Sequence, residues 1–148
     1  MPAPTDPPPA PPLTRVVETA LYFDDLPAAT AFYRDVLGLH VMTEGSRLVA
    51  FDAGAGTVLL LFKRGATADG FRWPGGSIPP HDGSGPAHVA LGVAAADLDV
   101  WERRLTALGV AVDGRATWTL GGRSLYFRDP GDHSLELVTP GTDRKSVV

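Results

Sequence analysis

Three ionisable side chains stand at matched places in two imperfect copies of one sequence unit. The segment FDAGAGTVLLL aligns without gaps with FRDPGDHSLEL, and this alignment pairs Leu60 with Glu136. The segment ETALYFDDL aligns with HVALGVAAADL, which has a two-residue insertion, and this alignment pairs Glu18 with His88. Carboxylates and imidazoles are ligands of hard and borderline divalent cations. The repeat therefore predicts a metal site made by Glu18, His88 and Glu136.

Each of the three residues has an alternative structural explanation. Glu18 is compatible with a solvated charge at a strand start, His88 with a histidine hydrogen-bonded at a strand end, and Glu136 with an acid on a solvated sheet face. Their common register favours metal ligation. Two buried carboxylates and an imidazole without partners cost several kcal/mol each, and a divalent cation removes that cost.

The composition of the chain excludes several classes of function. The chain has 148 residues, 44% of them hydrophobic, which is enough for one domain with a real core. The absence of cysteine excludes disulfides and thiolate metal sites. The net charge is -4 and there is no Lys/Arg cluster, so the sequence does not indicate a positively charged surface for nucleic acid or for an anionic membrane. No apolar run is long enough to span a bilayer. We expect a cytoplasmic protein that acts on a small molecule.

Each copy is predicted to fold as a βαβββ unit. Alternation puts Glu18 and Tyr22 on one face of the first strand. Asp24-Asp25 and Pro27 are typical of a helix start, and Gly38 of a helix end. The expected strands of the first unit cover residues 16–23, 41–43, 47–52 and 58–62. The second unit has a helix over residues 98–108, and its strands are expected over residues 87–93, 110–112, 124–128 and 134–139.

Composition shifts divide the chain into five parts. Residues 1–13 are rich in proline and predict a disordered or polyproline II leader. Modules over residues 14–62 and 87–140 flank a Gly/Pro-rich connection over residues 63–86, which is either a linker or a lid that covers a substrate. Residues 141–148 form a tail.

The segments ETALYFDDLPAATAFYRDVLGL, HVALGV and RSLYFRDPGDHSLELVTP resemble the vicinal oxygen chelate superfamily, which includes glyoxalases, bleomycin-resistance proteins and extradiol dioxygenases. The resemblance implies an α+β, glyoxalase-like fold in which two βαβββ modules form a curved-sheet cavity with the helices outside. It also implies a homodimer. Its four ligand places fall on Glu18, Leu60, His88 and Glu136, of which Leu60 cannot coordinate.

The resemblance implies a divalent ion (Mn, Zn, Ni, Co or Fe(II)) that chelates two adjacent substrate oxygens and stabilises an oxyanion or enediolate. A lyase or isomerase is expected, with Glu136 or Glu18 as general base. Leu60 argues against a four-ligand glyoxalase site. Glu18, where dioxygenases and fosfomycin enzymes carry histidine, argues against both of those classes. A metal-free protein that sequesters a drug-like ligand is the first alternative, and an extradiol-type dioxygenase is the second.

Further side chains are candidates for lining the cavity, each with simple packing or surface exposure as its alternative. Leu60 and Phe62 share one strand face and predict an apolar wall. The other substrate-binding candidates are Tyr22, Trp73, Trp118, Arg123 and Tyr126. His133 lies in a predicted turn and is expected to be exposed to solvent.

Overall fold

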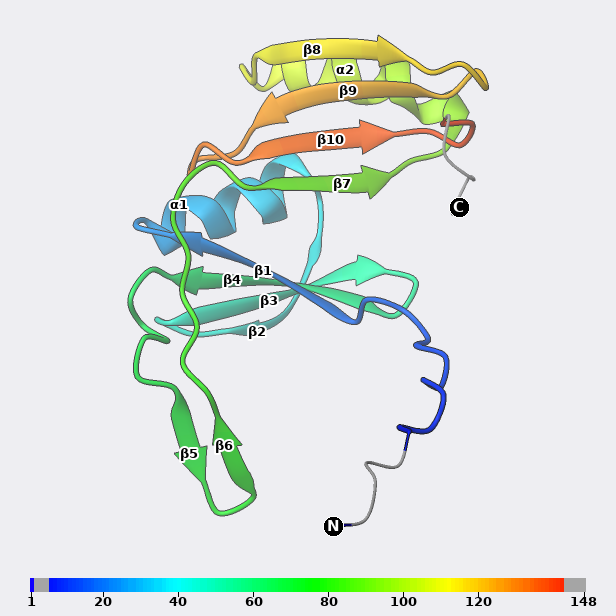
Figure 1. The fold of residues 1–148 in the computed structure, drawn as a ribbon. Coiled ribbons are helices and arrows are strands. Elements are labelled where there is room, and N and C mark those ends of the chain that lie inside the picture. The colour runs from blue at the N-terminus through cyan, green and yellow to red at the C-terminus, as the bar shows by residue number, and fades with distance from the viewer. Residues whose placement is uncertain (2–5, 143–148) are drawn as a thin grey trace.

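The computed structural model describes Met1 and residues 6–142. No helix in this part of the chain is long and apolar enough to cross a membrane. The regular elements follow one another in this order (Figure 1): β1 (Glu18–Phe23), α1 (Leu26–Ala31), the π-helical turn η1 (Phe32–Val36), β2 (His40–Glu44), β3 (Leu48–Gly54), β4 (Thr57–Lys63), β5 (Phe71–Trp73), β6 (Gly76–Ile78), β7 (His88–Gly92), the 3₁₀ turn η2 (Ala95–Asp97), α2 (Leu98–Ala107), β8 (Val112–Thr117), β9 (Arg123–Arg128) and β10 (Ser134–Val138).

Two four-stranded sheets have the same topology. The strand order is β1-β4-β3-β2 in the first sheet and β7-β10-β9-β8 in the second. In each sheet the first strand of the module pairs in parallel with the last, and the remaining pairs are antiparallel. The predicted α+β fold of two βαβββ modules is confirmed. β1 and β7 are edge strands, so each leaves one row of backbone groups without a strand partner within its sheet.

Local sequence explains the first helix. The Asp25 carboxylate accepts a hydrogen bond from the Ala28 amide at 3.0 Å, and Pro27 occupies the first turn, where its missing N–H costs nothing. The helix continues into η1, whose wider turn carries Tyr33 into the protein interior. Gly38 ends the segment at φ 71°, a backbone conformation that favours glycine.

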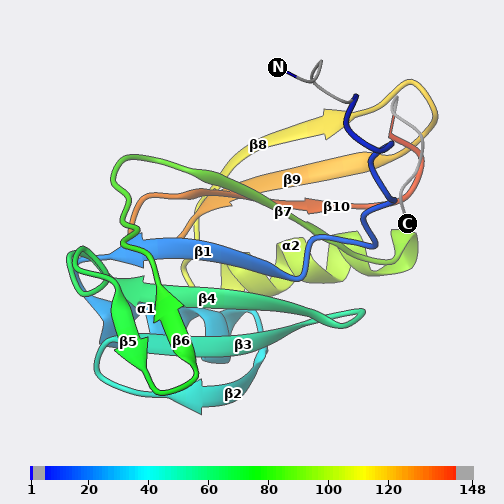
Figure 2. The same cartoon turned by 60° about the horizontal axis from the view of Figure 1, so that its bottom comes forward.

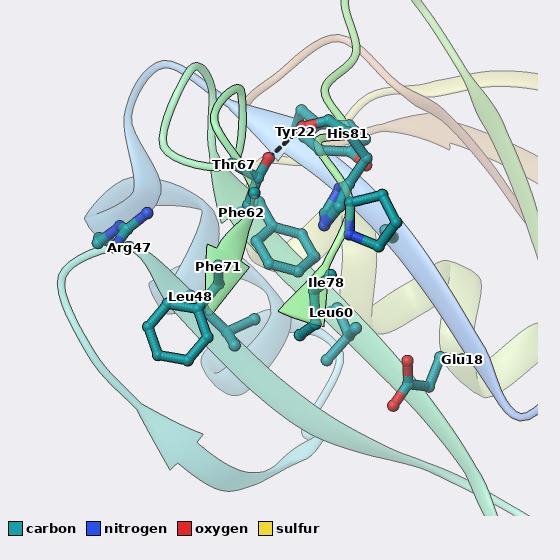
Figure 3. A pocket seen from close by; sticks show the side chains of 13 residues that line it. Glu18, Tyr22, Arg47, Leu48, Leu60, Phe62, Thr67, Phe71, Ile78 and His81 are labelled. Atoms are coloured by element: carbon teal, nitrogen blue, oxygen red, sulfur yellow. Dashed lines mark hydrogen bonds between the residues drawn. The ribbon is translucent and has the colours of Figure 1, made fainter. Parts of the chain in front are cut away.

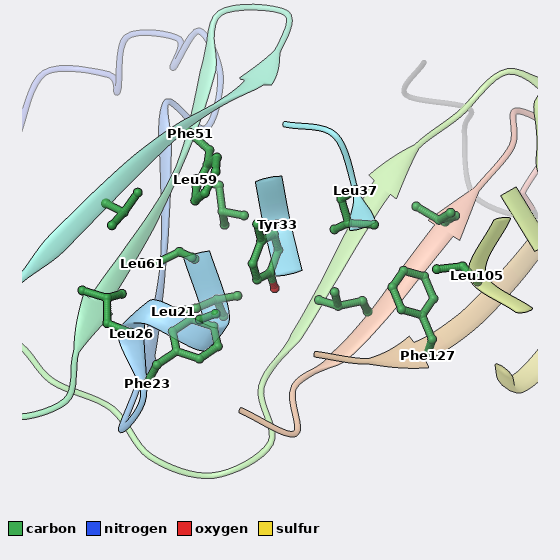
Figure 4. Close-up of a cluster of buried hydrophobic side chains, with 14 of the residues drawn as sticks. Leu21, Phe23, Leu26, Tyr33, Leu37, Phe51, Leu59, Leu61, Leu105 and Phe127 are labelled. Carbon is green, nitrogen blue, oxygen red and sulfur yellow. The ribbon is translucent and has the colours of Figure 1, made fainter. Parts of the chain in front are cut away.

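Both modules contribute to one hydrophobic core, and η1 lies between the two sheets (Figure 4). The rings of Phe32 in η1 and Phe127 in β9 lie 6.4 Å apart. The Arg104 guanidinium of α2 donates to the carbonyl of Val36 at 3.0 Å, which joins α2 to the end of η1. The fully buried members of the core include Phe23, Phe51, Leu59, Leu61, Leu105, Leu125, Leu135 and Leu137.

The helical layer is placed differently from the expected arrangement. Sequence reasoning put the helices outside a cavity enclosed by the two sheets, whereas within one chain η1 lies between the sheets. The physical reason is that each sheet has one strongly apolar face, and short helices shared between both faces bury them together. The opposite face of each sheet, which we call its outer face, therefore points away from the other module.

A buried polar cluster joins the modules. The Tyr33 hydroxyl donates to Asp129 Oδ2 at 2.7 Å, and His133 Nδ1 lies 2.9 Å from the same oxygen. Asp129 Oδ1 accepts from the amides of Gly131 and His133 at 2.9 and 3.0 Å. The expectation that His133 is exposed is wrong, because its ring packs edge-on to Phe23 at 4.8 Å and is 3% exposed. A turn position does not reveal that the other module covers it.

The connection between the modules contains a hairpin that the sequence did not predict. Within the described part of the chain, strands β5 and β6 pair only with each other, and they stand beside the face of the first sheet turned away from the second module (Figures 1 and 2). The strand expected over residues 110–112 is instead β8. Residues 6–13, the described part of the proposed leader apart from Met1, form no helix or strand. Residues 2–5 and 143–148, including most of the predicted tail, lie outside the described residues.

Candidate functional site

His88 and Glu136 meet on the outer face of the second sheet. His88 Nε2 lies 3.3 Å from Glu136 Oε1, although the two residues are far apart in the chain. His88 Nδ1 lies 2.8 Å from the carbonyl oxygen of Ser134, which can only accept a hydrogen bond. The proton of a neutral His88 is therefore on Nδ1, and the Nε2 lone pair faces the carboxylate. This tautomer is the one that a metal ligand requires.

The other oxygen of Glu136 accepts a hydrogen bond from a neutral donor, which is itself held by a second one. Ser124 Oγ donates to Glu136 Oε2 at 2.5 Å, and Trp118 Nε1 donates to Ser124 Oγ at 2.8 Å. Only 10% of the Glu136 side chain is exposed. A carboxylate so poorly hydrated is stabilised by a cation, either a protonated imidazole or a metal ion. Two ligand atoms at about 2.1 Å from one ion lie about 3.0 to 3.4 Å apart, and the distance from His88 to Glu136 fits this range.

Tyr126 completes this group of residues. Its ring stacks on His88 with centroids 6.3 Å apart, and β9 pairs it directly with Glu136 on β10. Burial raises the pKa of Tyr126 above its ordinary value, and the neighbouring Glu136 carboxylate raises it further. The phenol is consequently a protonated donor at neutral pH.

Glu18 lies on a different surface. It belongs to the outer face of the first sheet, where it lines a pocket together with Tyr22, Leu60 and Phe62 (Figure 3). The outer faces of the two sheets point away from each other, so one chain does not bring Glu18 to His88 and Glu136. Among the described residues, no group of three or more His, Cys, Asp or Glu side chains converges as a metal site. The metal ligand set remains a prediction.

The pocket beside Glu18 has a volume of about 720 Å³. Leu60 and Phe62 form part of its floor, as the sequence predicts for one face of β4. Tyr22 stacks on Phe62 with centroids 5.7 Å apart, and its hydroxyl lies 2.6 Å from His81 Nδ1. Burial raises the pKa of Tyr22, and the charge of Asp82 raises it further.

The remaining candidates lie elsewhere. Trp73 is half exposed on the β5–β6 hairpin and stacks on Phe71 at 5.8 Å. Arg123 pairs with Asp99 of α2 at 3.1 Å, on the helix side of β9. Sequence reasoning did not select Ser124 as a site residue. Strand alternation was the available signal, because Ser124 is two residues from Tyr126 and so shares its face.

Fold and site together define a class of protein. Two βαβββ modules display ionisable residues on the outer faces of their sheets, at the matched places of an internal repeat. The family model for the Glyoxalase/Bleomycin resistance protein/Dioxygenase superfamily matches residues 15–137. The chain belongs to this superfamily, and its fold is glyoxalase-like.

Comparisons with individual proteins agree with this assignment. A lactoylglutathione lyase from Agrobacterium tumefaciens is 37% identical, with a TM-score of 0.79 over 87% of this chain and 96% of that chain. The fosfomycin resistance protein FosX from Listeria monocytogenes has the same fold at 22% identity, with a TM-score of 0.63 over 86% of this chain and 93% of that one. The metallothiol transferase FosB of Bacillus licheniformis is 42% identical over 53 residues, which span 35% of this chain and 34% of that relative.

Proposed function

We propose that the chain is a divalent-metal-dependent enzyme that acts on a small metabolite as a lyase or isomerase. In this proposal a homodimer binds each metal ion with Glu18 of one copy and with His88 and Glu136 of the other. The observation that carries the proposal is the His88–Glu136 pair. A histidine whose Nδ1 is engaged by a backbone carbonyl presents its Nε2 3.3 Å from a nearly buried carboxylate oxygen.

A second copy of the chain is the natural source of the third ligand. Glu18 begins β1 and His88 begins β7, and these are the edge strands of their sheets. Bringing the β1 edge of one copy to the β7 edge of another would place Glu18 beside the partner's His88–Glu136 pair. A two-fold arrangement of this kind is closed and creates two identical sites. It would also cover both exposed strand edges.

The residues at the site support acid–base chemistry. A bound divalent ion would supply Lewis acidity toward two adjacent substrate oxygens. With Leu60 at the fourth place, three protein ligands leave positions open for substrate and water. Ser124 holds one oxygen of Glu136, which leaves the other to bind a metal or to accept a proton from substrate. Tyr126 and Glu18 are the further proton donor and acceptor of the proposed site.

Metal binding and subunit mixing test this proposal together. Titration of the metal-free wild type with Mn²⁺, followed by electron paramagnetic resonance, is expected to give one ion per chain. The variants Glu18→Ala and His88→Ala are each expected to lose binding. When they are unfolded together and refolded as a mixture, mixed dimers have one intact site, so about one quarter of the wild-type Mn²⁺ capacity returns. No recovery in a mixture that does form dimers would refute the shared site, and Mn²⁺ binding by His88→Ala equal to wild type would refute the ligand set.

The apolar pocket beside Glu18 favours a second candidate function, a metal-free protein that sequesters a drug-like ligand. The two candidates differ in their dependence on metal. Tight ligand binding that a chelator leaves unchanged, in a protein that binds no Mn²⁺, would favour sequestration.

A further inference from the structure

The pocket beside Glu18 is mainly apolar and has a floor and a roof. Its floor is the outer face of the first sheet, where Leu60 and Phe62 project from β4. Its roof comes from the connection between the modules, through Phe71 and Ile78 of the β5–β6 hairpin (Figure 3). A pocket of about 720 Å³ is large enough for a compact organic molecule.

The segment that follows the hairpin is attached to the floor by specific contacts. His81 Nδ1 lies 2.6 Å from the Tyr22 hydroxyl, and the His81 ring packs edge-on to Phe62 at 4.8 Å. The backbone amide of His81 also donates to the Thr67 carbonyl at 3.1 Å. Gly83 passes so close to Tyr22 that a Cβ would lie 2.6 Å from its ring. The base of the roof therefore has a defined position over the sheet.

The hairpin itself leaves large apolar side chains uncovered. Phe71 pairs with Ile78 across the hairpin, and both line the pocket. They are 54% and 47% exposed, while Trp73, which stacks on Phe71, is 46% exposed. Exposed apolar groups around a concave apolar floor mark a place where a ligand gains affinity by removing apolar surface from water.

The charges in the pocket restrict its ligand. Among the lining residues, all in the described part of the chain, Arg47 is the one side chain that is always positive, and its guanidinium already donates to the Ala66 carbonyl. Glu18 adds a negative charge. A ligand with several carboxylates would have only Arg47 as a permanently positive partner among these described lining side chains, and Arg47 already donates a hydrogen bond to the protein. Glu18 and Tyr22 are four residues apart on the same face of β1, or roughly 13 Å, so the apolar region extends well beyond the metal-ligand end.

We propose that the substrate of the enzyme has adjacent oxygen atoms attached to an aromatic or branched alkyl group, and that this group is buried between the first sheet and the β5–β6 hairpin. This inference rests on the proposed function for the role of the oxygen atoms, and on the pocket alone for the apolar group. It disfavours a multiply charged, peptide-like substituent at this position.

Two probes with the same chelating head test the inference. Phenylglyoxylate and glyoxylate both carry a carboxylate beside a carbonyl, and they differ in the phenyl ring. By NMR titration of the wild-type protein with Zn²⁺, phenylglyoxylate is expected to bind roughly 10- to 100-fold more tightly than glyoxylate. It is also expected to bind more tightly than S-methylglutathione, which carries two carboxylates and an ammonium group.

Matched variants connect the preference to the pocket. Ile78→Asp puts a charge on the hairpin that forms the roof of the pocket. It is expected to reduce the phenyl preference, which is the ratio of the affinities for phenylglyoxylate and glyoxylate, at least tenfold. Val100→Asp makes the same change at a similarly exposed position on α2, away from the pocket, and is expected to leave the preference unchanged. Equal affinity for the two glyoxylates, tighter binding of S-methylglutathione, or an unchanged preference in Ile78→Asp would each overturn the inference.

Repeating the titrations with EDTA separates this inference from the proposed function. The phenyl preference is expected to persist in metal-free protein, because the ring is recognised by apolar contacts. A protein that prefers phenylglyoxylate and binds no Mn²⁺ would refute the metal enzyme and retain the apolar site. A protein that binds Mn²⁺ without any phenyl preference would refute the substrate class alone.

Discussion

Replacement of Tyr33 by phenylalanine tests whether the polar cluster between the modules stabilises the fold. The Tyr33 side chain is fully buried, and its hydroxyl donates to Asp129 Oδ2 at 2.7 Å. Asp129 is itself buried, and without the hydroxyl the one contact that this oxygen would retain among the described residues is that with His133. A hydrogen bond to a buried charged group contributes about 1.5 to 3 kcal/mol. The aromatic packing of Tyr33 is kept in the variant.

We expect Tyr33→Phe to lower the free energy of unfolding by about 2 kcal/mol, which corresponds to a fall in Tm of about 4 to 8 °C for a chain of this size. Calorimetry and urea unfolding at one fixed protein concentration measure the change. Tyr22→Phe is the matched control, because it removes an equally short hydrogen bond, to His81, from a partly exposed position. Its expected cost is below about 1 kcal/mol.

A double-mutant cycle with Asp129→Asn assigns the loss to this contact, and the expected coupling energy is above about 1 kcal/mol. Equal destabilisation by Tyr33→Phe and Tyr22→Phe would contradict the reasoning. So would a change in Tyr33→Phe of less than about 0.5 kcal/mol, since that is the scale of an ordinary surface substitution.

Three further predictions follow from the described contacts. Ser124→Ala is expected to weaken Mn²⁺ binding about 10- to 100-fold by releasing one oxygen of the buried carboxylate, whereas Ser124→Thr keeps the hydroxyl and most of the affinity; isothermal titration calorimetry measures both. Burial and the adjacent Asp129 carboxylate raise the pKa of Tyr33, so above about pH 10 the unfolded chain loses a proton that the folded chain keeps. The free energy of unfolding is therefore expected to fall as the pH rises above this value, and the contribution of Tyr33 to this fall is absent in Tyr33→Phe. Gly83→Ala is expected to displace the Tyr22 ring and lower Tm, while Gly92→Ala, where a Cβ meets nothing within 4 Å, has little effect on Tm.

Predictions about single strands succeeded because they depend on local rules. The alternation of polar and apolar residues identified the face of β1 that carries Glu18 and Tyr22, and the face of β10 that carries Glu136. Turn and capping residues identified the start and end of the first helix. Each of these features depends on neighbours a few residues away in the chain.

Predictions about assembly were less complete. No local pattern indicated that η1 lies between the sheets, or that His133 is covered by Phe23 of the other module. The β5–β6 hairpin also escaped prediction, because its two three-residue strands are too short for a periodic signal.

The sequence alone determined the internal repeat, the two βαβββ modules and the matched positions of Glu18 and His88 in the two copies of the repeat. The reason is that strand parity and the order of elements are local properties of the chain. Which faces meet was decided by the tertiary structure. Strand parity shows that two side chains each lie on the polar face of their own sheet. The direction in which those faces point is determined by the burial of the large apolar faces. Within one chain, the parallel pairing of β7 with β10 brings His88 to Glu136, and the burial of the apolar faces turns Glu18 away from both.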